Sequence, residues 1–163
     1  MSELRDLVID AHGGIDRWNE VKAIDGDMSI TGLLWARKGW PDALKGVHVT
    51  VDTKVQSTTY RPFTDPNKRS IYRPDHTVVA TLDGQILEER RNPRSAFESH
   101  KPETPWDALH LAYFSGYAMW NYLCTPFMFA LPGFKAEEIE PWDEHGEQRR
   151  RLKVTFPDSL ATH

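Results

Sequence analysis

The sequence has almost no cysteine, and this scarcity excludes two classes of small protein. Cys124 is the single cysteine among 163 residues, so neither an internal disulfide framework nor a multi-cysteine zinc site can form. Its sequence neighbours Leu123, Thr125 and Pro126 include no cation that would activate the thiol. We therefore interpret Cys124 as a buried, unreactive side chain.

The sequence also lacks an excess of charge of either sign. Twenty basic residues stand against 24 acidic ones, which gives a formal net charge of −4. A general nucleic-acid-binding protein carries a basic patch or stripe, so this balance predicts no nucleic-acid partner. The short run Arg149–Arg151 follows an acidic stretch, and we interpret it as a solvated strand edge neutralised by nearby acids.

A secretory signal is absent from the start of the sequence. The first ten residues include Glu3, Asp6 and Asp10 and contain no apolar core of the kind that signal peptides carry. This predicts a cytoplasmic protein, provided that the chain is complete at that end.

Charged residues are missing from one long stretch, the 21 positions of 111–131. That length would permit a membrane span, which needs roughly 20 apolar residues. The stretch is aromatic rather than rich in leucine and isoleucine, it contains Asn121, and Pro126 breaks it. We therefore expect no transmembrane segment.

Motifs for catalysis, metal binding and cofactor binding are lacking too. The seven histidines occur singly, and the HExxH, GxSxG, GxGxxG and P-loop patterns are all absent, so we expect no metal ion and no cofactor. Asp107 and His110 stand one helical turn apart and could act as an orienter and a base. Helix capping is the more common role of such a pair, so an enzyme using Asp107 and His110 ranks as the last of our alternatives.

Hydrophobic residues make up 39% of the sequence. This share is enough for the core of a single domain, which we expect to span residues 1–163. An amphipathic pattern predicts a helix over residues 2–11, ended by Gly13-Gly14. Alternating polarity and turn residues predict strands over the following ranges: 23–35, 47–60, 70–73, 77–82, 85–91, 134–140 and 150–156. The turn Asp83-Gly84 predicts a tight hairpin that sets Val79 opposite Glu88 and Ala80 opposite Leu87. The fold class expected is α+β, with a mostly antiparallel sheet.

One long apolar helix is predicted late in the chain. Thr104 can cap it, Pro105 suits its first position, and the helix should run to about Leu123, before Pro126. Trp106, Leu109, Tyr113, Tyr117 and Trp120 share one face, while Leu111, Ser115, Ala118 and Tyr122 share another. A single sheet can cover only one of these faces. The second face either completes the core or faces a partner, a membrane surface or an enclosed apolar cavity.

Trp35 and Trp40 flank the basic turn Arg37-Lys38-Gly39. Two tryptophans beside cations could touch a lipid headgroup surface, or the tryptophans could fold back under the sheet. The sequence leaves both interpretations open.

The opening of the chain is similar to a known family. Ala11-His12-Gly13-Gly14, followed by Trp18, Val21, Ile24 and a strand from Gly26, resembles the start of the lipoprotein-carrier (LolA/LolB-like) superfamily. The later stretch from Thr104-Pro105-Trp106-Asp107 through Leu131-Pro132-Gly133-Phe134 resembles a bacterial subgroup without an assigned activity. The resemblance implies a strongly curved antiparallel sheet, an unclosed half-barrel, whose hollow is covered by helices and accepts acyl chains. It also implies further strands after His163, so we expect a barrel that lacks its C-terminal strands. Those carriers are exported, whereas this N-terminus shows no signal.

The leading hypothesis is a protein without catalysis that binds a hydrophobic ligand, an acyl chain or similar lipid, against the aromatic helix. The residues expected to line the site are Trp106, Tyr113, Tyr117, Trp120, Phe127, Phe129, Met28, Ile30, Val49 and Val51. The alternative is an assembly module that forms a homodimer or docks a partner through the aromatic helix or an exposed C-terminal strand edge.

Overall fold

The computed structural model describes residues 2–161, which form two compact units. One unit is Lys22–Leu123. The described residues of the other come from 2–21 and 124–161. The prediction of a single domain stays a prediction.

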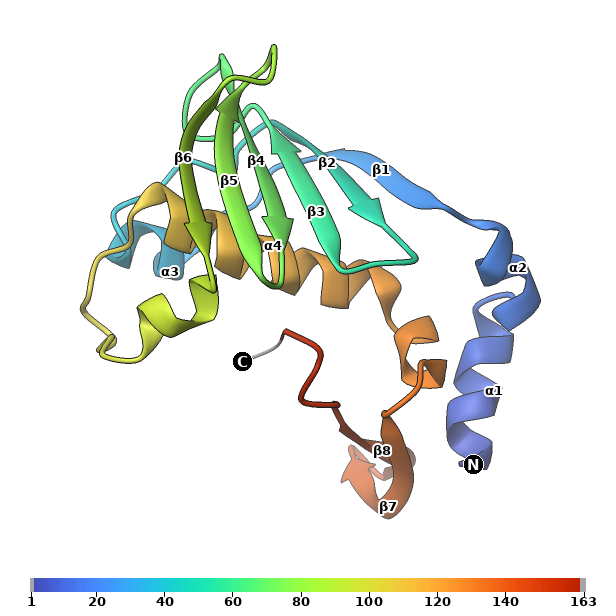
Figure 1. Cartoon of the computed structure of the whole chain (residues 1–163). Helices are drawn as coiled ribbons and strands as arrows, with labels where there is room; N and C mark the ends of the chain where they lie inside the picture. The colour runs from blue at the N-terminus through green and yellow to red at the C-terminus, as the bar shows by residue number, and fades with distance from the viewer. Residues whose placement is uncertain (1, 162–163) are drawn as a thin grey trace. The chain divides into compact units, whose positions relative to one another are not determined.

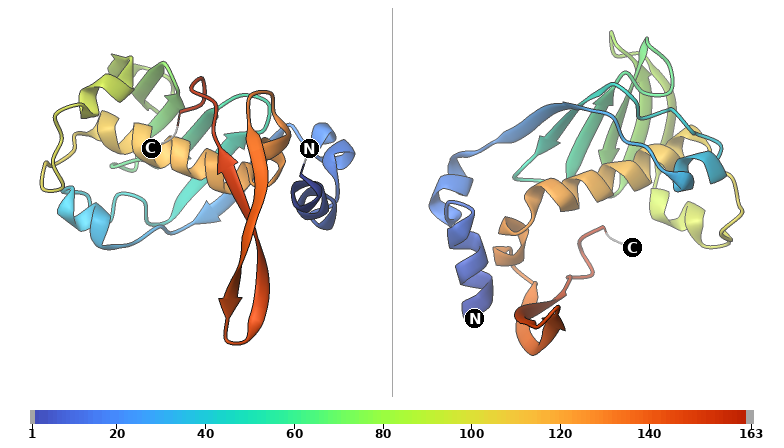
Figure 2. Two further views of the ribbon diagram at one scale, coloured as in Figure 1. Left: turned by 90° about the horizontal axis from the view of Figure 1, so that it is seen from below. Right: turned by 180° about the vertical axis from the view of Figure 1, so that it is seen from behind.

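The unit Lys22–Leu123 is built on one six-stranded antiparallel sheet in which each strand pairs with the next along the chain (Figure 1). Its strands are β1 (Ala23–Met28), β2 (Val47–Asp52), β3 (Ser57–Arg61), β4 (Lys68–Arg73), β5 (His76–Thr81) and β6 (Ile86–Arg91). The sheet is curved and does not close into a barrel, and helix α4 (Ala108–Cys124) runs across one of its faces (Figures 1 and 2). This confirms the predicted α+β class with an unclosed antiparallel sheet and one long helix.

The first strand is shorter than predicted. The expected strand over 23–35 ends at Met28, and the chain then turns into a short helix, α3 (Leu33–Arg37), so that part of the prediction was wrong. Gly32 precedes the helix with a φ of 151°, and Gly39 follows it with a φ of 90°. Glycine tolerates such backbone angles, and these two positions allow a helical turn where the alternating pattern indicated extended chain.

The predicted strand over 47–60 is two strands, β2 and β3, joined by a tight turn. Asp52 causes the break, because its Oδ1 accepts the backbone N–H of Lys54 at 2.7 Å and of Val55 at 3.1 Å. Such a local side-chain turn competes with the strand ladder and reverses the chain. The alternation of valines through Val51 is correct, and Val49 and Val51 are fully buried.

The hairpin of β5 and β6 was predicted in part. Val79 pairs with Glu88 as expected, but Ala80 pairs with Ile86 rather than Leu87, because a register shift follows Val79. Thr81 and Gln85 close the turn, with the Thr81 N–H donating to Gln85 O at 2.9 Å and the Gln85 N–H donating to Thr81 Oγ1 at 2.9 Å. The loop therefore holds three residues instead of two.

Helix α4 begins at Ala108, three residues later than predicted. Asp107 rather than Thr104 stands at its start, and Asp107 Oδ1 accepts the backbone N–H of His110 at 2.8 Å. Thr104 instead accepts the N–H of Lys101 through its Oγ1 at 2.9 Å, so it belongs to the preceding turn.

Close contacts hold α4 on the sheet. The Thr58 hydroxyl donates to Gly116 O at 2.9 Å, and the Trp120 indole N–H contacts the carbonyl of Asp52 at 2.8 Å. Gly116 lies directly on Tyr72, since a Cβ built on this glycine would stand 2.3 Å from the Tyr72 Cβ. The glycine thus permits the close approach of helix and sheet.

The second unit contains helices α1 (Glu3–Ala11) and α2 (Ile15–Glu20), the short 3-10 helix η2 (Phe127–Ala130), and a hairpin of β7 (Lys135–Glu144) and β8 (Glu147–Thr155). The N-terminal helix is confirmed. The two final strands are longer than predicted and form a separate two-stranded sheet, visible as a long ribbon in the left view of Figure 2. The expected strands after His163 lie outside the described residues.

No helix within residues 2–161 is long and apolar enough to cross a bilayer. The prediction that the stretch 111–131 is not a transmembrane segment is confirmed to that extent.

Candidate functional site

An apolar pocket of about 340 Å³ opens in the unit Lys22–Leu123. One wall is the segment 30–35, which includes the start of α3. The other residues around it come from β3 and from one flank of α4: Tyr60, Phe114, Ser115, Ala118, Met119 and Tyr122. Small-molecule sites range from about 300 to 1,000 Å³, so the pocket is large enough for one slender ligand.

Aromatic packing joins the two walls of the pocket. The ring of Trp35 meets the edge of Phe114 with centroids 5.9 Å apart, and Phe114 also contacts Trp106 at 4.8 Å and Tyr117 at 5.3 Å. Edge-to-face pairs of this kind add stability beyond the buried area alone. The wall around Phe114 is therefore tied into the buried aromatic core.

The two buried hydroxyls in the wall are already hydrogen bonded. The Tyr60 hydroxyl donates to Ser115 O at 3.0 Å, and the Ser115 hydroxyl donates to Leu111 O at 2.7 Å. Burial raises the pKa of Tyr60 more strongly than its bond to Ser115 lowers it, so this hydroxyl stays neutral. No charged residue lines the pocket. It consequently offers a ligand apolar surface.

Large hydrophobic side chains are exposed at the rim. Leu33 is 76% exposed, Leu34 39% and Tyr122 73%, and all three line the pocket. Helix α3 has no buried residue. Isolated exposed leucines are ordinary, but apolar residues gathered around one pocket are typical of a binding surface.

The ten residues predicted to line the site are spread more widely. Ile30 lines the apolar pocket. Six of the ten are buried in the core: Val49, Val51, Trp106, Tyr113, Tyr117 and Trp120. Met28 is half-buried at the end of β1. Phe127 and Phe129 belong to the other unit, where Phe127 stacks on Trp18 at 4.3 Å and Phe129 contacts Phe134 at 6.1 Å.

Several of the pocket residues missing from the predicted set have a signal in the sequence. Ser115, Ala118 and Tyr122 belong to the second face of the predicted helix, and that face borders the pocket. Trp35 also has a signal, because it flanks the basic turn Arg37-Lys38-Gly39. In the predicted strand over 23–35, Leu34 shares a face with Met28 and Ile30, whereas Leu33 has no signal of this kind.

Phe127 lines a smaller pocket in the unit that contains α1 and α2. This pocket measures about 310 Å³ and is bordered by His12, Gly14, Arg17, Trp18, Val21 and Phe127. Its surface is as polar as it is apolar and it has a cationic side chain, so it suits a hydrocarbon ligand less well than the pocket beside α4.

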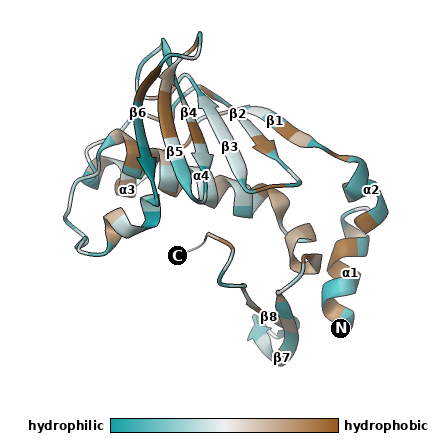
Figure 3. Cartoon of the chain, viewed as in Figure 1, coloured by the Kyte–Doolittle hydropathy of each residue, from teal (hydrophilic) through white to brown (hydrophobic). Residues whose placement is uncertain are grey.

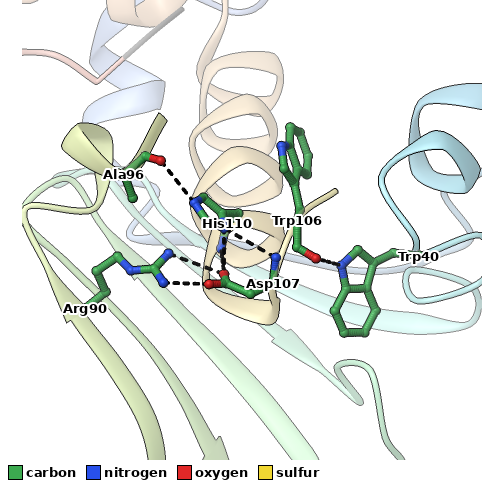
Figure 4. Close-up of polar contacts among 6 residues, drawn as sticks. All are labelled: Trp40, Arg90, Ala96, Trp106, Asp107 and His110. Atoms are coloured by element: carbon green, nitrogen blue, oxygen red, sulfur yellow. Dashed lines mark hydrogen bonds and ion pairs between the residues drawn. The ribbon is translucent and has the colours of Figure 1, made fainter. Parts of the chain in front are cut away.

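Asp107 and His110 do lie together, at the start of α4 (Figure 4). Arg90 reaches from β6 and donates to Asp107 Oδ2 at 2.6 Å and to Oδ1 at 3.3 Å. Burial opposes ionisation of Asp107, but the Arg90 bonds and the His110 N–H outweigh it, and the pKa of Asp107 is lowered. The carboxylate is therefore held in its charged form.

The imidazole of His110 is enclosed on both sides. Its Nδ1 lies 2.8 Å from Asp107 Oδ1, and its Nε2 lies 3.3 Å from Ala96 O (Figure 4). The backbone N–H of Asp107 donates to His110 Nδ1 at 3.3 Å, and this direction leaves Nε2 to donate to Ala96 O. The trio Arg90, Asp107 and His110 joins the start of α4 to β6, and the enzyme alternative stays a hypothesis.

The basic turn packs against the chain before α4. Lys38 is 6% exposed, and its Nζ donates to Pro102 O at 2.7 Å and to Thr104 O at 3.0 Å. The Trp40 indole N–H donates to Trp106 O at 2.9 Å (Figure 4). Of the two interpretations left open, these contacts favour a turn that folds back on the protein.

Within residues 2–161, no group of three or more His, Cys, Asp and Glu side chains could hold a metal ion. Cys124 is buried, as predicted. Comparisons with models of protein families, with curated proteins and with solved structures gave no match.

Proposed function

We propose that this protein binds a hydrophobic ligand, an acyl chain or a similar lipid, in the pocket between the segment 30–35 and α4. The observation that carries the proposal is an uncharged pocket whose rim exposes Leu33, Leu34 and Tyr122 to water. The resemblance to the lipoprotein-carrier superfamily supports it, because that family implies an unclosed sheet with an apolar hollow.

The energetics favour a chain-like ligand. Each methylene removed from water contributes about 0.8 kcal/mol, so a few methylenes in a partly enclosed pocket suffice for measurable binding. A ligand would also cover the exposed apolar rim. Since the hydroxyls of Tyr60 and Ser115 are engaged within the protein, the polar end of the ligand would remain in solvent.

Native mass spectrometry of the purified protein, with organic extraction of the same sample, tests this proposal. We expect a bound lipid species that is lost when a bulky side chain fills the pocket, as in Ala118→Phe. If no lipid co-purifies, and if none binds when fatty acid is added, the proposal is refuted.

The second candidate is an assembly module, favoured by strand edges that have no partner within residues 2–161. In the six-stranded sheet these are the outer edges of β1 and β6, and the hairpin of β7 and β8 has two more. A two-stranded hairpin is marginally stable alone, and bare edges can pair with another chain. Light scattering at high concentration would reveal a homodimer. Charge placed at exposed Tyr122 is the right probe for the helix, because Tyr117 and Trp120 are buried and their replacement would disturb the fold.

A further inference from the structure

A second cavity, of about 360 Å³, lies in the loops of the unit Lys22–Leu123 and is distinct from the pocket proposed for the hydrophobic ligand. Its walls come from the chain between α3 and β2, residues 39–45, and from the turn between β3 and β4, residues 62–66. The two pockets share no residue.

Trp40 provides a fixed aromatic surface in this cavity. Its indole N–H donates to Trp106 O at 2.9 Å and its backbone N–H donates to Trp35 O at 2.7 Å. No ring or cation within residues 2–161 packs on the Trp40 ring. Because the Trp40 indole is held in place and half-exposed, it does not have to rearrange before a ligand binds. Such preorganisation favours binding.

Three prolines in the wall of this cavity supply no backbone hydrogen-bond donor. Pro41, Pro62 and Pro66 line the cavity, and proline has no backbone N–H. An anion would need donors in the wall to replace its water, and three of the ten lining residues cannot supply one from the backbone. The lining therefore disfavours an anionic ligand.

The charges around the cavity sum to a negative value. Asp42, Asp65 and Lys45 line it, and Lys45 Nζ lies 2.6 Å from Asp42 Oδ1. Both partners of that pair are more than half exposed, so the pair is weak and can exchange partners. Asp65 supplies the unbalanced charge, and its Oδ1 is fixed by the backbone N–H of Asn67 at 2.9 Å.

We propose that this cavity binds a small organic ammonium ion, with the cation over the Trp40 ring and its charge balanced by Asp65. Tryptophan is the aromatic side chain that attracts cations most strongly, and aromatic surfaces are a common means of recognising quaternary ammonium groups. The proposal does not depend on the binding of a hydrophobic ligand beside α4.

Titration of the full chain with choline, followed by calorimetry or ligand-observed NMR, tests the proposal. The key comparison is a neutral analogue in which carbon replaces the ammonium nitrogen. We expect saturable choline binding, weaker binding of the analogue, and about tenfold weaker choline binding by Trp40→Leu, within the range of a single cation–π contact. Asp65→Asn should also weaken choline binding.

Two control variants make the result decisive. Trp40→Phe keeps an aromatic face and should bind choline with intermediate affinity, which guards against a folding defect in Trp40→Leu. Trp142→Leu removes an exposed tryptophan in the other unit and should leave binding unchanged. Equal binding of choline and its neutral analogue, unchanged binding by Trp40→Leu, or binding of a proline-rich peptide but not of choline would overturn the proposal.

Discussion

At the scale of single residues, Gly116 and Asp107 determine how α4 packs on the sheet. Gly116 lets the helix lie directly on Tyr72, and Asp107 joins the start of the helix to Arg90 on β6. Both features come from residues far apart in the sequence. Neither shows in the periodicity of the helix, which indicates only that the helix is apolar.

Replacement of Gly116 by alanine should destabilise the protein. The new Cβ would stand 2.3 Å from the Tyr72 Cβ and 2.4 Å from its Cγ, atoms that cannot move without shifting the strand. We expect a loss of about 1–3 kcal/mol or more in the free energy of unfolding, measured with chemical denaturant.

The control for Gly116→Ala is Gly26→Ala in β1, where the added Cβ would meet only the Met28 Cε at 3.8 Å. Gly26→Ala should change stability little. Equal effects of the two substitutions would show that the approach of α4 to Tyr72 is looser than described.

Asp107 should make stability depend on pH in the acid range. Its pKa is lowered in the folded protein, so the stability that it contributes is fully present above the unfolded value of 3.8. That stability is lost as pH falls through the folded pKa. Denaturation of Asp107→Asn at a series of pH values should show a smaller loss of stability below about pH 4 than the unchanged protein does.

Asp75→Asn, at an exposed position between β4 and β5, serves as the comparison for Asp107→Asn. Asp75→Asn should lose as much stability at low pH as the unchanged protein does. If Asp107→Asn lost as much stability as well, the pairing of Asp107 with Arg90 and His110 would contribute nothing to stability.

At the scale of elements, the buried Lys38 links the turn after α3 to the chain before α4. Its Nζ donates to backbone carbonyls of Pro102 and Thr104, and it lies 5.3 Å from the centre of the Trp106 ring. Hydrogen bonds from a charged donor to neutral carbonyls are among the stronger ones in proteins.

Lys38→Met should loosen the segment 98–106. We expect a loss of about 1.5–3 kcal/mol in stability and faster hydrogen exchange in this segment, because buried carbonyls lose their donor. Arg37→Met removes the adjacent exposed cation and should have little effect. Similar exchange in both variants would contradict the linking role of Lys38.

The elements also show what the sequence could and could not predict. Alternation of polar and apolar residues correctly indicated β2, and the apolar stretch before Pro126 correctly indicated a helix up to about Leu123, although its predicted cap at Thr104 was wrong. The break at Asp52 and the helix after Gly32 depend on local side-chain and glycine geometry, which competes with periodicity over a few residues. Figure 3 shows β6 changing from hydrophobic to hydrophilic along its length, and this change in polarity weakens any alternating pattern.

The sequence could predict that one face of the long helix borders the candidate site. It could not predict the set of residues that line the site. The sequence identified two apolar faces of the helix, but it could not show which of them the sheet covers. The pocket lies on the face with Ala118 and Tyr122, while Tyr113, Tyr117 and Trp120 are buried. The stacking of Phe127 on Trp18 joins positions more than a hundred residues apart, and no local pattern indicates such a contact.

At the scale of the whole molecule, the central claim is that an unclosed antiparallel sheet and one apolar helix create a binding pocket for a hydrocarbon chain. The six-stranded sheet buries a core against one side of α4, and a flank of the same helix remains available beside the segment 30–35. The function that we propose thus depends on the helix having more apolar surface than the sheet covers.

Titration with a fluorescent long-chain fatty acid tests this claim most directly, with Ala118→Phe compared against Ala36→Phe. Ala118 lines the pocket, whereas Ala36 is exposed on α3 and does not line it. We predict saturable binding by the unchanged protein and by Ala36→Phe, and at least a tenfold loss of affinity, about 1.4 kcal/mol, in Ala118→Phe. Absence of binding by the unchanged protein, or equal binding by the two variants, would contradict the claim.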